Sequence, residues 1–282
     1  MVGWLTGEDL VNLLMMLRTV DDRAFVILEG SADCQALDSH IDEAAAVTFP
    51  AHSKSAANRA IELADQRQLG NVLAILDRDW VGMLTTALDS PNVVYTDDYD
   101  LDATILQTGA VMEKILSSYT DRDVRSRDLT RMTLDAKGLV TKLAGEAGLM
   151  RFVSEEHDMG LRCGGLPIHR ALTPAEDAID LEKLTVIAVS RSPHCVVTEA
   201  VVIATVQQRR THAGDLRPYC NGHDMSCVMA ALIKRWGGNA SQLAVERAAR
   251  AAFSCADLQA TRLYGAVIAW SKLSHATVWN CT

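Results

Sequence analysis

Acidic side chains follow two apolar runs of the chain at the point where each run ends. Glu29 comes directly after residues 24–28 (AFVIL), and Asp77 and Asp79 follow residues 71–76 (NVLAIL). Clustered carboxylates repel one another and resist desolvation, so a protein tolerates them best when a cation neutralises them. Carboxylate oxygens suit Mg²⁺ or Mn²⁺. The pattern therefore predicts a divalent metal site.

The spacing of these acids suggests how they converge. Residues i and i+2 of an extended segment point to the same side, so Asp77 and Asp79 would address one metal cluster while Arg78 points away. Asp33 lies one helical turn beyond Glu29 and can rejoin the same edge. Such a site can bind a phosphate oxygen, activate a water molecule and stabilise the leaving oxygen. That chemistry is phosphodiester hydrolysis.

The elements that must position these acids alternate between strands and helices. Short strands are expected at residues 24–28, 47–49, 71–76 and 92–96, with helices at about 6–19, 31–39 and 55–68. This alternation predicts an α/β fold with a parallel sheet, whose carboxyl strand ends gather functional groups. The last of these strands leads into a helix that runs to about residue 118 and is preceded or begun by four acids, Asp97, Asp98, Asp100 and Asp102.

The composition and the pattern of apolar residues change after about residue 118. A charged stretch is followed by helical patterns at residues 135–156, 199–210, 224–236 and 242–272. We place a boundary near residue 125. Residues 1–125 are expected to form the α/β domain with the catalytic acids, and residues 126–282 a mainly α-helical C-terminal region.

The composition of the chain indicates where the protein is located and what it can bind. No stretch approaches the roughly 18 apolar residues that span a bilayer, and the N-terminus carries acids where a signal peptide carries positive charge. The seven cysteines are irregularly spaced, so reduced thiols and a cytoplasmic location are expected. With a net charge of −9, the chain lacks the overall positive charge that proteins binding nucleic acid usually carry. A partner subunit would then supply the phosphate-binding surface.

Five segments carry a family resemblance. In order, FVILEGSADCQAL, SKSAANRAIELA, VLAILDRDW, VYTDDYDLDATIL and CNGHDMSCVMAAL resemble the Toprim-like family catalogued as domain of unknown function 4435. The resemblance spans about residues 23–235 and implies a Toprim-like, Rossmann-like sheet flanked by helices. It also implies that Glu29 acts as general acid/base or metal ligand, with metal held by Asp33, Asp77 and Asp79.

The later motifs of the family match less fully. Tyr99 and Asp102 match the tyrosine and the acid of the third block, which implies that Asp102 is a metal ligand, but Ala103 replaces the asparagine that usually follows. Lys54 is similar to the basic residue before the second helix, and His223 lies in the Gly-His-Asp block. We take Lys54, Arg78 and His223 as candidate contacts to the substrate.

The Toprim resemblance implies topoisomerase, primase or nuclease chemistry on nucleic acid. Relatives occur beside ATPases in anti-phage defence systems, where the Toprim chain is the nuclease effector. The sequence thus leads us to expect a magnesium- or manganese-dependent nuclease acting on DNA or RNA, working with an ATPase partner or as a homo-oligomer. Nothing in the residues separates DNA from RNA.

Three other interpretations stay open. Asp77 and Asp79 also resemble the nucleophile and acid of haloacid-dehalogenase phosphatases, although that motif normally follows the first strand. A non-catalytic Toprim-like module that binds nucleotide or metal would fit the negative charge and the missing asparagine. Cys220, His223 and Cys227 have a zinc-like spacing without an obvious fourth ligand.

Overall fold

The computed structural model describes residues 6–131 and 134–281 and divides into two compact units. Residues 1–101 and 253–282 form one unit, the sheet domain, and residues 102–252 form the other, the helical domain. This division differs from the expected boundary near residue 125. The chain leaves the sheet domain earlier, and its last segment returns to it.

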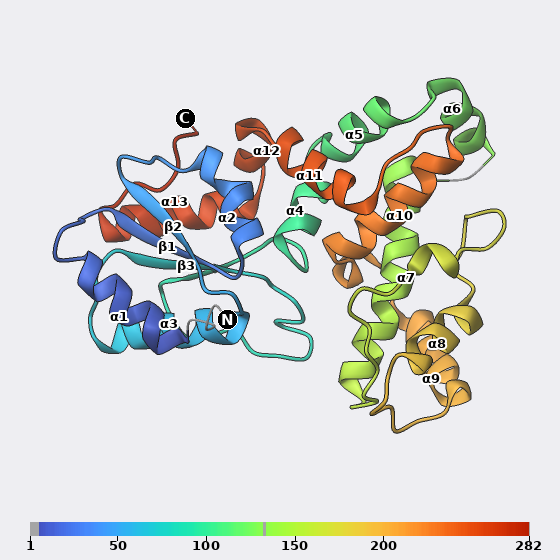
Figure 1. Ribbon diagram of the computed structural model, residues 1–282, viewed down its shortest axis with the longest axis horizontal. Helices are drawn as coiled ribbons and strands as arrows, with labels where there is room; N and C mark the ends of the chain where they lie inside the picture. Colours follow the sequence, from blue (N-terminus) through green and yellow to red (C-terminus); the bar gives the residue numbers. More distant parts are fainter. Residues whose placement is uncertain (1–5, 132–133, 282) are drawn as a thin grey trace. The chain divides into compact units, whose positions relative to one another are not determined.

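A parallel sheet of four strands lies at the centre of the sheet domain (Figure 1). The strands are β1 (Ala24–Leu28), β2 (Ala46–Pro50), β3 (Val72–Leu76) and β4 (Val93–Tyr95), in the spatial order β2-β1-β3-β4. Every residue of β1 and β3 is buried, as expected for central strands covered on both faces. The predicted α/β class with a parallel sheet is confirmed.

Helices cover both faces of this sheet. α1 (Gly7–Leu17) and α3 (Lys54–Gln66) lie on one face, and α2 (Ser31–Leu37) and α13 (Arg262–Ser274) on the other (Figure 1). The short elements η1 (Asp38–His40) and α12 (Cys255–Gln259) complete the domain. Leu14 of α1 and Ile61 of α3 pack with Phe25 and Ile27 of β1 in one buried apolar cluster. Alternate residues of β1 thus anchor the layer formed by α1 and α3.

The helical domain is built around one long helix, α7 (Ala136–Glu156), most of which is buried. A methyl group at Gly148 would overlap the backbone carbonyl of Tyr219, so this glycine permits close packing. The predicted helical region is confirmed. The other helices of this domain are α4 (Leu101–Gln107), α5 (Val111–Tyr119), α6 (Arg122–Thr130), η2 (Ile168–Arg170), α8 (Leu181–Ser190), α9 (Glu199–His212), η3 (Arg217–Tyr219), α10 (Gly222–Arg235) and α11 (Gln242–Ala252).

Two predicted helices are interrupted. The helix expected after β4 is divided into α4 and α5 near Gly109, whose φ of 51° lies in the left-handed region. The helix expected over residues 242–272 is divided into α11, α12 and α13. The side chains of Ser254 and Thr261 cap α12 and α13 by accepting backbone N–H groups, which favours new helix starts at these positions.

The expectation of reduced cysteines is wrong for one pair, because Cys255 and Cys281 form a disulfide. The return of the last segment to the sheet domain brings their Cα atoms to 5.3 Å, a proximity that their spacing in the sequence does not reveal. The other five cysteines do not form disulfides. In the described part of the chain, no helix has the length and apolar character needed to cross a membrane.

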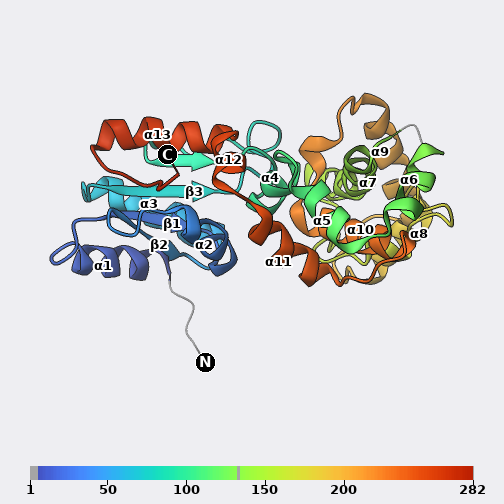
Figure 2. The same ribbon diagram turned by 90° about the horizontal axis from the view of Figure 1, so that it is seen from above.

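Asp97 ties the returning segment to the sheet. Its two carboxylate oxygens accept the backbone N–H groups of Arg262 and Leu263, each at 2.8 Å, in the first turn of α13. α13 packs against β4 (Figure 2). One of the four acids after β4 therefore has a structural role, since it satisfies N–H groups at a helix start that lack partners within the helix.

We predict that Asp97→Ala destabilises the sheet domain by about 1–2 kcal/mol, because two backbone donors lose their acceptor. Asp97→Asn keeps one acceptor and should cost less. Urea unfolding, with hydrogen exchange measured on α13, tests this expectation. The matched control is Asp89→Ala, which changes an exposed acid of the same domain. Equal effects of the Asp97 and Asp89 substitutions would contradict the assigned role.

Candidate active site

Glu29 and Asp77 directly follow the adjacent strands β1 and β3. The strand order reverses between these two strands, so the connections leave in opposite directions, and in parallel sheets such a switch point is where ligands usually bind. Glu29 Oε1 accepts the backbone N–H of Asp77 at 3.0 Å. The structure therefore brings together the two acids that the sequence places at strand ends.

Lys54, the first residue of α3, lies among these acids. Its Nζ donates to the backbone carbonyl of Asp77 at 2.6 Å and makes a short ion pair with Asp79. It also lies 4.0 Å from Glu29 Oε1. Lys54 thus acts as an internal counter-ion for the carboxylates at this edge of the sheet.

Two further acids contribute negative charge. Asp33 Oδ2 accepts the backbone N–H of Gly30 at 2.8 Å and so fixes the start of α2. Among the neighbouring charges, Asp100 contributes most to the raised pKa of Asp77. The segment after β4 therefore supplies Asp100 to this edge.

The electrostatics of the site show an excess of negative charge. Burial, opposed by Lys54 and reinforced by nearby acids, raises the pKa of Glu29 to about 7. Burial and the charges of Asp100 and Glu29 raise the pKa of Asp77 well above its usual range. Desolvated neighbouring carboxylates disfavour one another's charged forms. One lysine does not neutralise this group, which favours binding of a further cation.

Strand alternation does not place Asp79, because β3 ends at Leu76 and Asp79 has a left-handed backbone with φ 44°. Its N–H donates to the carbonyl of Tyr99 at 2.7 Å, and the Tyr99 ring packs edge-on against Trp80 at 4.6 Å. Left-handed backbone is uncommon outside glycine, although aspartate tolerates it better than most residues. A tight turn held by the segment after β4 therefore directs Asp79 towards Lys54.

Asp102, predicted as a metal ligand, binds an arginine instead. It belongs to the helical domain, and both of its oxygens bind the Arg250 guanidinium, at 2.9 Å to Nε and 2.6 Å to a terminal nitrogen. A bidentate arginine satisfies the carboxylate geometrically and electrostatically. Asp102, which matches the acid in the third block of the resemblance, is therefore already paired with Arg250 in this structure.

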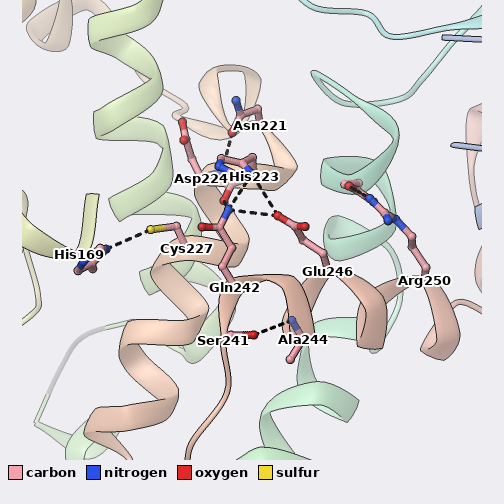
Figure 3. Close-up of polar contacts among 11 residues, drawn as sticks. His169, Asn221, His223, Asp224, Cys227, Ser241, Gln242, Ala244, Glu246 and Arg250 are labelled. Atoms are coloured by element: carbon pink, nitrogen blue, oxygen red, sulfur yellow. Dashed lines mark hydrogen bonds and ion pairs between the residues drawn. The ribbon is translucent and has the colours of Figure 1, made fainter. Parts of the chain in front are cut away.

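The other candidate substrate contacts also have partners. Arg78 donates its backbone N–H and its Nε to Thr96, each at 3.0 Å, which agrees with a side chain directed away from the acids. His223 is exposed in the helical domain, with Nδ1 3.1 Å from Glu246 and 2.7 Å from the Gln242 amide (Figure 3). Arg78 thus supports the backbone after β4, and His223 stays accessible to solvent.

The Gly-His-Asp block has structural reasons of its own. Asn221 caps α10 by accepting the Asp224 N–H at 2.7 Å, and buried Asp224 pairs with Arg151. At Gly222 a Cβ would lie 2.7 Å from the backbone nitrogen of Ala103, so only glycine fits against α4 there. The block therefore fixes the packing of α10 within the helical domain.

The zinc interpretation of Cys220, His223 and Cys227 is not supported by their positions. Cys220 Sγ lies 3.2 Å from the carbonyl of Thr141. Cys227 Sγ lies 3.7 Å from His169 Nδ1, as Figure 3 shows. His223 has the separate partners given above. Each of the three side chains thus faces a different neighbour, and they form no common ligand set among the described residues.

The acids of the sheet edge fit a hard divalent cation by chemistry and charge. Their donors are carboxylate oxygens, and burial together with the charges of neighbouring acids raises the pKa values of Glu29 and Asp77, which a bound cation would lower again. In the described part of the chain they do not form a ready-made group of three ligands. Lys54 holds Asp79, so a metal would have to compete with this ion pair.

Comparison of the chain with protein-family models and with curated proteins found no match.

We predict that, in the presence of chelator, the free energy of unfolding falls as pH rises from about 4.5 to about 7. Between these values folded Glu29 holds a proton that the unfolded chain has released, so its burial becomes increasingly unfavourable. The difference between the two pKa values corresponds to roughly 3 kcal/mol. Glu29→Gln should remove this contribution. Parallel pH slopes for wild type and variant in denaturant unfolding would refute the assignment.

We also predict that Lys54→Met tightens Mn²⁺ binding by about tenfold or more, because the competing cation is removed from the acids. Titration calorimetry on the metal-free protein measures the change. Lys114→Met, in the helical domain, is the matched control and should leave the affinity unchanged. Weaker Mn²⁺ binding by folded Lys54→Met would show that Lys54 does not compete for the metal ligands.

Proposed function

We propose that the protein is a metal-dependent nuclease of the Toprim type that hydrolyses phosphodiester bonds in DNA or RNA. The observation that carries this proposal is the crowding of partly buried acids at the β1 and β3 strand ends, where burial and mutual repulsion raise the pKa values of Glu29 and Asp77. Perturbed carboxylates at a topological switch point favour a functional site over a structural one.

The residues of this edge have distinct roles in the proposal. Asp77 and Asp79, with Asp33 beside them, would hold Mg²⁺ or Mn²⁺, which supplies charge stabilisation for a phosphate oxygen and lowers the pKa of a bound water. Glu29, with a pKa of about 7, can accept or donate a proton near neutral pH. Lys54 provides an ammonium group that can bind a phosphate oxygen of the substrate.

The cellular role in the proposal comes from the family resemblance. There the Toprim chain is the nuclease effector of an anti-phage system and acts with an ATPase in the cytoplasm. The net charge of −9 supports a need for a partner, because the chain lacks the overall positive charge that draws nucleic acid to a protein. An ATPase partner would supply that surface.

A non-catalytic regulatory module is the second candidate. The Lys54–Asp79 ion pair and the lack of a ready-made group of three acidic ligands in the described residues favour it. Such a module would bind a metal or nucleotide at the same edge and leave phosphodiester bonds intact. The two candidates therefore differ in turnover and share the binding site.

We predict that the purified protein cleaves nucleic acid only with Mg²⁺ or Mn²⁺. The assay uses supercoiled plasmid, single-stranded DNA and total tRNA, each with metal or chelator. Glu29→Gln and Asp77→Asn should each lower the rate by about a hundredfold or more, because proton transfer and metal binding are lost. Gel analysis of the three substrates also identifies the substrate class.

Asp89→Asn is the matched control, since it removes an exposed acid of the same domain and should leave cleavage unchanged. Equal cleavage by wild type and both site variants would exclude this edge as the active site. If folded wild type binds Mn²⁺ but cleaves none of the substrates, alone or with an ATPase from its genomic neighbourhood, the regulatory module replaces the nuclease proposal.

A further inference from the structure

A second cluster of ligand-type side chains lies in the sheet domain. His40 ends η1, Cys255 begins α12, and Cys281 follows in the last segment of the chain. His40 Nδ1 lies 3.4 Å from Cys281 Sγ and 3.6 Å from Cys255 Sγ. In the described residues this is the one group of at least three histidine, cysteine or acidic side chains whose ligand atoms all lie within 4.8 Å of one another.

Backbone contacts hold this cluster in place independently of the disulfide. The N–H of Asn280 donates to the carbonyl of His40 at 2.9 Å, and the N–H of Asp42 donates to the carbonyl of Val278 at 2.8 Å. Ile41 and Trp279 form an antiparallel bridge between these two hydrogen bonds. The last segment therefore lies against residues 40–42 through two backbone hydrogen bonds, which together make up this bridge. These hydrogen bonds join backbone atoms and do not involve the sulfurs of Cys255 and Cys281.

The histidine is difficult to explain by the disulfide alone. His40 is 4% exposed, and its ring packs edge-on against Phe253 at 5.4 Å. A disulfide needs no imidazole beside it, and its sulfurs are weak hydrogen-bond acceptors. A buried imidazole nitrogen that faces two sulfurs at nearly equal distances has the composition of a soft metal site.

We propose that, in the reduced protein, His40 Nδ1 and the thiolates of Cys255 and Cys281 bind one Zn²⁺ ion. Zn²⁺ accepts mixed imidazole and thiolate ligands in tetrahedral geometry, and water or a small anion would take the fourth position. The ion joins the end of η1 to the start of α12 and to the last segment. This site is distinct from the acids at the strand ends and does not depend on the nuclease proposal.

The disulfide and the zinc complex are alternative states of the same two sulfurs. An external dithiol attacks the disulfide, becomes oxidised to a disulfide itself, and leaves Cys255 and Cys281 as two thiols. Zn²⁺ then replaces both thiol protons, which pass to solvent. The oxidised chain has no thiolate to offer at this position, so zinc affinity reports the redox state of the pair.

Metal analysis of the full chain tests the proposal. The protein is reduced, its free thiols are counted, and Zn²⁺ binding is measured by competition with a chromogenic chelator, with Co²⁺ as a spectroscopic substitute that reveals thiolate ligands. We expect one equivalent of Zn²⁺ and a cobalt–thiolate absorption band. His40→Gln and Cys281→Ser should weaken binding by about a hundredfold or more, since each removes a direct ligand.

Cys34→Ser is the matched control, because Cys34 is a buried free cysteine of the same domain outside the cluster. It should bind Zn²⁺ as wild type does, and oxidised wild type should give no cobalt–thiolate band. Circular dichroism verifies that each variant is folded. The proposal fails if fully reduced wild type gives no cobalt–thiolate band, or if folded His40→Gln binds Zn²⁺ as tightly as wild type. A variant that does not fold leaves the wild-type cobalt spectrum as the deciding measurement.

Discussion

Burial of carboxylates at the carboxyl ends of β1 and β3, reinforced by their mutual repulsion, is the constraint on which the candidate site depends. The two strands are wholly buried, so Glu29 and Asp77 emerge where water is scarce and their charged forms are unfavourable. α3 answers this by starting with Lys54, which reaches Asp79 and the Asp77 carbonyl. The buried carboxylates at this edge remain electrostatically unfavourable for the folded state. Such unfavourable groups are common where a protein binds a ligand that neutralises them.

The sequence was informative where local pattern decides the structure. Continuous apolar runs predicted β1 and β3, and Glu29 and Asp77 were located because they follow those runs directly. Asp79 was found by its spacing, but its left-handed backbone was not, because hydrogen bonding to Tyr99 imposes it from another part of the chain. Local chemistry identified the acids, and tertiary contacts determined their directions.

Contacts between residues far apart in the sequence could not be predicted, for a related reason. Asp102 matched a motif position, yet its partner Arg250 lies 148 residues further along, where nothing in the local pattern marks it. The helices after residue 242 all read as amphipathic segments, and periodicity does not reveal that α13 belongs to the sheet domain. The same applies to Cys255 and Cys281, whose proximity follows from that return.

The discontinuous sheet domain has a consequence for biosynthesis. Residues 1–101 emerge from the ribosome first, but α13 and the anchor of its first turn on Asp97 become available only after the whole helical domain has been made. Until then one face of the sheet lacks part of its helical cover, so the nascent α/β core exposes apolar surface while the helical domain folds. The acidic edge consequently acquires its complete scaffold late, and a ribosome-bound fragment would carry these acids without it.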